Sequence, residues 1–334
     1  MSNLIKSFLP KRPKEKLRVA VFCPKVFWDR KMSQGRKDSI LAISRRPDVE
    51  LHVSGQGWED YDLSDKFCDN MHRIMPNADF IIWYKPLGSK GVPPLEDCHV
   101  WDKCLKVIRF NEAWWPDGRA AKECEQSGSD IVICHHENDL FRFDGISATV
   151  FHIPHCVEIR RFIPAVPWAS RKTNAILTGC ISKEVYPLRS RFVSIVKSGL
   201  VSGKIRRHPG YRLSCESECD SQAREYAKEL KESRLSIVCC STYKYSLGKY
   251  IESRAAGSVV VGDMPDDRVY WKWFEDIQIP VDSGMSDEEI AEKVNSISDS
   301  DLLERSVEGQ LRSHMHFSMD DYAEHLITKV LENI

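Results

Sequence analysis

Residues 241–257 hold the side chains whose types and spacing are best suited to binding chemistry. They read Ser-Thr-Tyr-Lys-Tyr-Ser-Leu-Gly-Lys-Tyr-Ile-Glu-Ser-Arg-Ala-Ala-Gly, a polar, glycine-containing turn between an apolar run and a helical pattern. Free N–H groups at a helix start, with the macrodipole behind them, favour an anion such as phosphate. We therefore predict an anion-binding turn formed by Tyr245, Ser246, Gly248 and Lys249.

Two charged side chains of this segment extend the prediction. Lys249 adds a point charge in the first helical turn, and Glu252 follows three residues later on the same side of the helix. A carboxylate there can accept hydrogen bonds from two vicinal hydroxyls, as an acidic residue does for ribose in dinucleotide folds. Phosphate plus ribose indicates a nucleotide. The alternative is a solvated pair of Lys249 and Glu252 on an ordinary helix.

The elements that must position these residues alternate between short apolar runs and longer helical patterns, as in parallel α/β sheets. The first half predicts strands at residues 18–22, 50–53, 79–84, 106–110, 130–134 and 149–153. The second half predicts strands at 174–178, 204–207, 235–240 and 258–262, and helices at 188–197, 221–232, 247–256, 286–296, 302–312 and 319–331.

The alternation is interrupted between residues 159 and 172, a segment with two prolines and two adjacent arginines. We predict an α/β protein of two doubly wound, Rossmann-like domains that face each other across a cleft, where the carboxyl ends of parallel strands bind ligands. The expected division is a basic tail (1–17), a first domain (18–158), a linker (159–172), a second domain (173–318) and a last helix packing back on the first domain (319–334).

Length and charge limit the classes of function. The 334 residues fit two domains of roughly 100–200 residues each, and 48 Lys+Arg against 49 Asp+Glu argue against a general nucleic-acid binder. No apolar run approaches the roughly 18 residues of a membrane span. The basic tail lacks a signal-peptide core, so we expect a cytoplasmic protein with a solvated tail. The alternative is an arm that contacts anionic lipid or a partner.

The order of these segments resembles a GT-B glycosyltransferase, close to the group-1 and spore-maturation-type glycosyltransferase-like proteins, over about residues 17–333. Residues 249–262 are similar to the family stretch K-x-x-E-x-x-A-x-G followed by an apolar strand. Residues 153–158 (Ile-Pro-His-Cys-Val-Glu) and 162–164 resemble the end of the N-terminal domain in those enzymes. Gly179 with Arg189 resembles the glycine and basic residue that open their C-terminal domain.

The chain departs from the family pattern at two places. Retaining members often carry E-x7-E, but the position eight before Glu252 is Lys244. The glycine pair that usually follows the first strand is also missing, and Gly35 stands alone. Retention and inversion of the sugar stereochemistry both stay open.

The resemblance implies that the second domain holds a nucleotide-sugar donor through Lys249, Glu252 and Arg189. His208 ends a predicted strand at the same sheet edge and is placed beside the nucleotide base, although a plain turn accounts for it equally well. We expect no metal-binding site of the D-x-D type, so helix N-termini and basic side chains must neutralise the diphosphate. We expect no metal and no cofactor apart from the nucleotide-sugar substrate.

An inverting transfer also needs a base that takes the proton of the acceptor hydroxyl. Glu112 follows a predicted strand and lies among Trp114 and Trp115, where partial burial raises a carboxyl pKa and flat rings stack on sugars. We predict Glu112 as the base, with Asp29 and His135 as further candidates on the acceptor side.

These observations predict a metal-independent hexosyl- or pentosyltransferase that moves a sugar from a nucleotide-sugar donor to a glycan, lipid-linked or protein acceptor. One alternative is a catalytically inactive GT-B-like module that binds a nucleotide or glycan. A second is a nucleotide-sugar epimerase of related fold, which would convert the donor without an acceptor.

Overall fold

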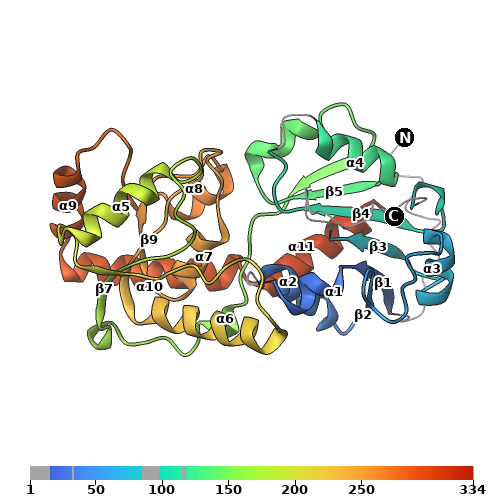
Figure 1. The fold of residues 1–334 in the computed structure, drawn as a ribbon, viewed down its shortest axis with the longest axis horizontal. Coiled ribbons are helices and arrows are strands. Elements are labelled where there is room, and N and C mark those ends of the chain that lie inside the picture. Colours follow the sequence, from blue (N-terminus) through green and yellow to red (C-terminus); the bar gives the residue numbers. More distant parts are fainter. Residues whose placement is uncertain (1–15, 32–33, 85–97, 115–117, 334) are drawn as a thin grey trace.

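The computed structural model describes residues 16–31, 34–84, 98–114 and 118–333. These residues form two α/β units that lie side by side along the long axis of the molecule (Figure 1). The expected basic tail, up to residue 15, and Trp115 lie outside the described residues. In the described part, no helix combines the length and the apolar character that crossing a membrane requires.

The first sheet contains six parallel strands in the order β2-β1-β3-β4-β5-β6. All six were expected, and each end lies within one residue of its predicted position. In β3 and β5 every residue is buried because helices cover both faces of the sheet, which explains their continuous apolar sequences. The strands are β1 (Leu17–Phe22), β2 (Val49–Ser54), β3 (Phe80–Trp83), β4 (Leu105–Phe110), β5 (Ile131–Cys134) and β6 (Thr149–His152).

The helices around this sheet are short. They are α1 (Lys25–Asp29), α2 (Gly35–Ser44), α3 (Phe67–Ile74) and α4 (Arg119–Ser127), with 3-10 turns η2 (Cys98–Val100) and η3 (Glu137–Phe143).

The second sheet contains five parallel strands in the order β11-β10-β9-β7-β8. Read in reverse, this order is β8-β7-β9-β10-β11, in which the second strand of the unit comes first, as in β2-β1-β3-β4-β5 of the first sheet. The chain therefore repeats one doubly wound topology. The strands are β7 (Thr173–Leu177), β8 (Gly203–Ile205), β9 (Ser233–Ile237), β10 (Val259–Gly262) and β11 (Ile279–Pro280). The helices are α5 (Pro187–Lys197), α6 (Glu216–Lys231), α7 (Gly248–Ala255), α8 (Arg268–Phe274), α9 (Asp287–Asn295) and α10 (Asp299–His316).

Several elements of the second half differ from the sequence expectation. Strands β8 and β9 end two and three residues earlier than predicted, and α10 extends beyond the predicted 302–312 at both ends. β11 was missed because it has two residues, one of them a proline without an N–H group. The seven-residue α8 was missed because its cluster of aromatic side chains shows no helical periodicity. Helix α6 begins at Glu216 rather than at residue 221, since its first turn is polar and acidic, which suits a helix N-terminus but carries no apolar pattern.

The chain crosses between the two units twice, and the crossings lie next to each other. The first includes 3-10 turns η4 (Ile159–Arg161) and η5 (Trp168–Ser170). On the return, the N–H of Val157 donates to the carbonyl of Phe317 at 2.8 Å, and that of Met319 donates to the carbonyl of Val157 at 2.9 Å. Helix α11 (Met319–Leu331) then packs against α2 of the first unit, as the red helix in Figure 1 shows.

The two-sheet α/β architecture predicted from the sequence is confirmed.

Candidate functional site

A cavity of about 260 Å³ lies between the two units, at the carboxyl ends of strands from both sheets. The segments after β4, β6, β7 and β8 contribute Glu112, His155, Gly179 and His208 to its wall. Doubly wound sheets bind ligands at this edge. Seven predicted site residues line the cavity: Glu112, Gly179, Arg189, His208, Gly248, Lys249 and Glu252.

Gly179 lets two cations come close together at the wall of the cavity. Its φ is 102°, in the range that favours glycine. A Cβ atom there would lie 3.0 Å from Nη1 of Arg189 and 3.0 Å from Cε of Lys249. The two basic side chains therefore flank the bare backbone of Gly179, and no other residue type fits without displacing them.

Arg189 is anchored by backbone groups and has no acidic partner among the residues that the structure describes. Its guanidinium donates to the carbonyl of Cys180 at 3.0 Å and to that of Cys239 at 2.9 Å. The side chain is 1% exposed, yet Nε makes no hydrogen bond and no described carboxylate pairs with it. Its charged centre also lies 3.8 Å from the ring centre of Tyr186, a cation–π contact. A buried charge without an acidic partner is costly in an empty site and favourable for an anion.

Lys249 is also without an ion-pair partner among the described residues. Its Nζ lies over the ring of Tyr226, 4.7 Å from the ring centre. Burial lowers the pKa of Lys249, the carboxylate of Glu252 counteracts this, and the nearby guanidinium of Arg189 adds to the lowering. An anion next to the ammonium group would oppose this lowering, because it favours the charged form of the lysine.

Glu252 is held by a tyrosine from another helix rather than by Lys249. The hydroxyl of Tyr226, in α6, donates to Oε2 of Glu252 at 2.9 Å. Burial and the adjacent Glu252 carboxylate raise the pKa of Tyr226, so the phenol remains the donor. This contact leaves Oε1 of Glu252 available to accept hydrogen bonds from a ligand. Lys249 and Glu252 do not form the direct pair that was the alternative reading of this segment.

Two helix N-termini add to the positive character of the cavity. Helix α7 begins at Gly248 with no acidic residue in its first turn, and α5 begins just after Tyr186, which lines the cavity. The N–H groups of both first turns carry the positive end of a helix dipole. Burial lowers the pKa of His208, and the positive charges of the neighbouring Lys249 and Arg189 lower it further. The histidine is therefore exposed to the same positive potential.

Glu112 occupies the first-sheet side of the cavity. The loss of hydration beside neighbouring protein atoms raises the pKa of its carboxyl. A hydrogen bond from Trp114 opposes this rise, and the charge of Asp139 adds to it. The indole Nε1 of Trp114 lies 3.3 Å from Oε2 of Glu112. The Trp114 ring stacks on Tyr243 of the second unit at 5.0 Å. A carboxylate with a raised pKa next to an aromatic surface suits a general base for a sugar hydroxyl.

Four predicted residues do not line this cavity. Asp29 is the last residue of α1, and Ser246 is buried. Tyr245 donates its hydroxyl to both carboxylate oxygens of Asp139, at 2.7 and 2.8 Å. His135 is 1% exposed, with Nδ1 2.7 Å from the carbonyl oxygen of Ile153.

Three of the lining residues that were not selected from the sequence, His155, Tyr186 and Tyr226, contact predicted site residues. His155 stacks on His135 with 4.7 Å between ring centres, and burial together with Arg109 lowers its pKa to about 3. The segment at 153–158 could have indicated His155, because it follows a predicted strand. Tyr186 and Tyr226 gave no comparable signal, since they lie on or beside helices and act through contacts distant in sequence.

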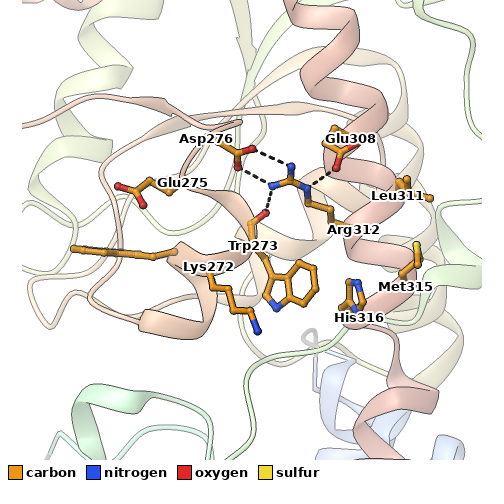
Figure 2. Close-up of a pocket in the computed structure, with 10 residues that line it drawn as sticks. Lys272, Trp273, Glu275, Asp276, Glu308, Leu311, Arg312, Met315 and His316 are labelled. Carbon is orange, nitrogen blue, oxygen red and sulfur yellow. Dashed lines mark hydrogen bonds and ion pairs between the residues drawn. The ribbon is translucent and has the colours of Figure 1, made fainter.

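A second cavity, of about 800 Å³, lies between α8 and α10 (Figure 2). Three of its charged residues already compensate one another, because Arg312 donates to Asp276 at 2.7 and 2.9 Å and to Glu308 at 2.6 Å. None of the predicted site residues lines it. The smaller cavity between the sheets is therefore the better candidate for chemistry.

No family model and no curated protein matches the chain by sequence. Solved structures match nearly all of it: a glycosyltransferase from Rickettsia africae aligns with a TM-score of 0.58 and 11% identity, covering 96% of this chain and 100% of that one. Sucrose-phosphate synthase from Thermosynechococcus elongatus aligns with a TM-score of 0.58 and 11% identity, covering 95% and 100% of the two chains.

The Anabaena protein HepE, solved in complex with UDP and glucose, has the same TM-score of 0.58 and 11% identity, with coverage of 95% and 100%. At this identity the likeness concerns the fold. It confirms that the chain has the GT-B architecture of two facing Rossmann-like domains, as the resemblance implied.

Proposed function

We propose that this protein is a glycosyltransferase that moves a sugar from a nucleotide-sugar donor to a carbohydrate-containing or other hydroxyl-bearing acceptor. Support comes from the shared fold, because similar structures include a glycosyltransferase, a sucrose-phosphate synthase and a protein solved with UDP and glucose. A fold does not determine a function, so the proposal depends on the chemistry of the cavity.

The observation that carries the proposal is the pair of Arg189 and Lys249 on either side of Gly179, with no described carboxylate paired to either. Two cations at the start of two helices provide charge for a diphosphate leaving group without a metal ion. The free Oε1 of Glu252 is then placed to accept from the two ribose hydroxyls. His208 lies at the edge of the same cavity, with its ring 4.6 Å from that of Tyr211, as a surface for the base.

The acceptor would enter from the first-sheet side, where Glu112 takes the proton of the attacking hydroxyl. Transfer by Glu112 as base inverts the anomeric centre. A glycan, a lipid-linked sugar or a glycoprotein remains our expectation for the acceptor, and a hexose or pentose for the transferred sugar. All twelve cysteines are free thiols, which is in keeping with a reducing, cytoplasmic environment.

Nucleotide binding is the first test. Thermal unfolding and calorimetry with UDP, GDP, CDP and dTDP should identify one nucleotide that stabilises the protein, by about 2.7 kcal/mol at 100 times its Kd. Lys249→Met should weaken that binding at least tenfold. Lys244→Met is the matched control, because Lys244 lies in the same turn but pairs with Asp263. An unchanged nucleotide affinity in Lys249→Met would contradict the proposed donor site.

Product analysis separates the proposal from its two rivals. The corresponding nucleotide sugar, incubated with an acceptor panel, should yield free nucleoside diphosphate and a glycosylated acceptor. Conversion of the donor to another nucleotide sugar without an acceptor would instead identify an epimerase. Tight binding with no turnover on any acceptor, and no slow hydrolysis of the donor, would identify an inactive binding module.

A further inference from the structure

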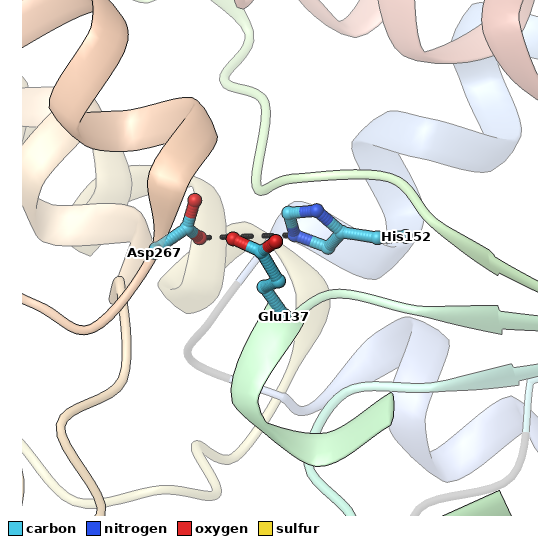
Figure 3. Close-up of side chains that lie close together, drawn as sticks. All are labelled: Glu137, His152 and Asp267. Carbon is cyan, nitrogen blue, oxygen red and sulfur yellow. Dashed lines mark ion pairs between the residues drawn. The ribbon is translucent and has the colours of Figure 1, made fainter. Parts of the chain in front are cut away.

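Glu137, His152 and Asp267 come together where the two units meet, at a place that does not line the cleft cavity (Figure 3). Glu137 begins η3 and His152 ends β6, both in the first unit, whereas Asp267 precedes α8 in the second. One ligand-type atom from each residue lies within 4.8 Å of the other two. The three side chains therefore converge from three segments and both units.

Two atoms of this cluster are buried and lack hydrogen bonds. Nε2 of His152 and Oδ2 of Asp267 have no hydrogen-bond partner among the described residues. They face each other at 3.7 Å, too far for a hydrogen bond. The side chain of Asp267 is 2% exposed and that of His152 is 10% exposed. Leaving buried polar atoms unsatisfied is costly, and native proteins usually provide a partner for them.

The spacing fits a metal ion better than a direct contact. Ligand atoms about 2.0–2.2 Å from a tetrahedral zinc ion lie roughly 3.3–3.6 Å from one another. The His152–Asp267 separation of 3.7 Å is close to this value. Oδ1 of Asp267 is already occupied, since it accepts from the N–H of Tyr270 at 2.9 Å, so the carboxylate is oriented with Oδ2 toward the histidine.

Glu137 completes the set but has a present partner. Its carboxylate accepts from the backbone N–H of Arg268 at 2.7 Å and pairs with the guanidinium of the same residue. The Arg268 side chain is 88% exposed, so its ion pair exchanges readily with solvent and with a competing cation. Two carboxylates and one imidazole offer three ligands and leave a fourth position for water.

We propose that Glu137, His152 and Asp267 form a binding site for a zinc-type divalent cation that ties the two units together. The imidazole favours zinc over magnesium or calcium, which prefer oxygen ligands alone. The ion links η3 and β6 to the N-terminus of α8, and so fixes the orientation of the two halves of the cleft. This site is separate from donor binding and does not depend on the proposed transferase activity.

The test uses the full chain after chelation and dialysis, titrated with Zn²⁺ and separately with Mg²⁺. Wild type should bind one Zn²⁺ at this site, with a rise in unfolding temperature that grows with Zn²⁺ concentration, and Mg²⁺ should have no effect. Asp267→Asn and His152→Gln should each weaken Zn²⁺ binding at least tenfold. Asparagine is also a good helix N-cap, so Asp267→Asn keeps the start of α8.

His52→Gln is the matched control, because His52 also contacts an aspartate, Asp60, at 2.5 Å, but no third ligand joins them among the described residues. It should bind Zn²⁺ like wild type. Substitution with Co²⁺ gives a second readout, since ligation by nitrogen and oxygen lacks the sulfur-to-metal absorption of a thiolate site. Unchanged Zn²⁺ affinity in both Asp267→Asn and His152→Gln, or a thiolate spectrum with Co²⁺, would overturn the proposal.

Discussion

The hydroxyl of Tyr226 donates a 2.9 Å hydrogen bond to Oε2 of Glu252 and thereby joins α6 to α7 at the wall of the cleft. Because one carboxylate oxygen is fixed in this way, the other keeps a defined direction toward the cavity. Lys249 lies on the Tyr226 ring, so one tyrosine positions both the acidic and the basic side chain of the proposed donor site.

Glu252→Gln should weaken the binding of the stabilising nucleotide by about ten- to one hundredfold, the value of one or two hydrogen bonds to a charged acceptor at about 1.5–3 kcal/mol. An amide offers one acceptor oxygen, which Tyr226 already occupies if the fold is kept. Calorimetry with the nucleoside and with its diphosphate checks the assignment to ribose, because both ligands should lose the same factor. A loss confined to the diphosphate would place Glu252 near the phosphates instead.

Tyr226→Phe should cause a smaller loss of nucleotide affinity, about two- to tenfold, corresponding to about 0.5–1.5 kcal/mol for one hydrogen bond. The carboxylate keeps its charge but loses its fixed orientation, while the ring under Lys249 is retained. The two substitutions act on one contact, so the double variant should be no worse than Glu252→Gln alone. Additive losses would show that Tyr226 acts on the ligand by another route.

Lys249→Met should have opposite effects on binding and on stability. It removes a cation that burial destabilises and that lacks a described acidic partner, so the ligand-free protein should unfold at an equal or higher temperature. A gain of about 1 kcal/mol raises the unfolding temperature of a domain of 150–250 residues by about 2–4 °C. The nucleotide affinity of Lys249→Met should be lower than that of wild type.

The stability effect has a pH dependence with a definite sign. Burial lowers the pKa of Lys249 below its ordinary value of 10.5, so the charged form costs stability at neutral pH. That cost disappears as the pH rises through the lowered pKa toward the ordinary value. The advantage of Lys249→Met should therefore shrink at alkaline pH. A Lys249→Met protein that unfolds earlier than wild type at pH 7 would contradict this account.

The sequence predicted those parts of the fold that depend on local pattern. Strands such as β3 and β5 are buried on both faces and appear as continuous apolar runs, which is why they were located closely. The two-residue β11 and the aromatic α8 have no such pattern, because tertiary packing alone defines them. Short elements carry too few residues for periodicity to be read.

The candidate site divides in the same way. Lys249 and Glu252 were selected because a polar turn between an apolar strand and a helix is visible in the local sequence, and both line the cavity. Tyr226 was not selected because it contacts Glu252 from a position 26 residues away in the chain. Asp29 was expected at the edge of the first sheet, but α1 intervenes after β1 and carries it away from the cavity. Tyr245 lies beyond a turn at Lys244, whose φ is 57°, and binds Asp139 of the first unit.

Gly179→Ala should lower both the free energy of unfolding and the affinity for the nucleotide. The loss of affinity should exceed that caused by an alanine elsewhere with the same backbone strain. A Cβ atom would come within 3.0 Å of both Arg189 and Lys249, which must move out of position. Gly199→Ala is the matched control, since Gly199 has a φ of 81° but no atom within 4 Å of its added Cβ. Each alanine should cost about 1–3 kcal/mol from its strained backbone.

The difference between the two glycine variants isolates the contact with the cations. Chemical denaturation measures the free energy of unfolding, and calorimetry on the folded fraction measures nucleotide affinity. Gly179→Ala should lose at least tenfold in affinity, and Gly199→Ala should bind like wild type. Equal affinity in both variants would mean that Arg189 and Lys249 do not need their present positions to bind the nucleotide.

Glu112→Gln should lower the transfer rate by about 10²–10⁴-fold if Glu112 is the general base, with little change in nucleotide affinity. The pKa of Glu112 is raised above its ordinary value of 4.5, chiefly by the loss of hydration. When the pH falls, the active carboxylate is therefore protonated at a higher pH than a solvated glutamate. The rate for wild type should rise with pH through that raised pKa. The residual rate of the variant should not rise with pH over this range, so its pH profile should lack this acidic limb.

The raised pKa of Glu112 also fixes the expected sign of the stability change. Its contribution to stability is fully present below the ordinary pKa and is lost as the pH rises through the raised one. At neutral pH the native state therefore holds an unfavourable carboxylate, but solvent screens its charge because Glu112 is exposed. Glu112→Gln should thus unfold at nearly the same temperature as wild type, with any change upward. Glu125→Gln, at an exposed position of α4, controls for the loss of one acidic group outside the cavity. Full activity in Glu112→Gln, or an unchanged acidic limb, would exclude Glu112 as the base and direct the search to the other groups on the acceptor side.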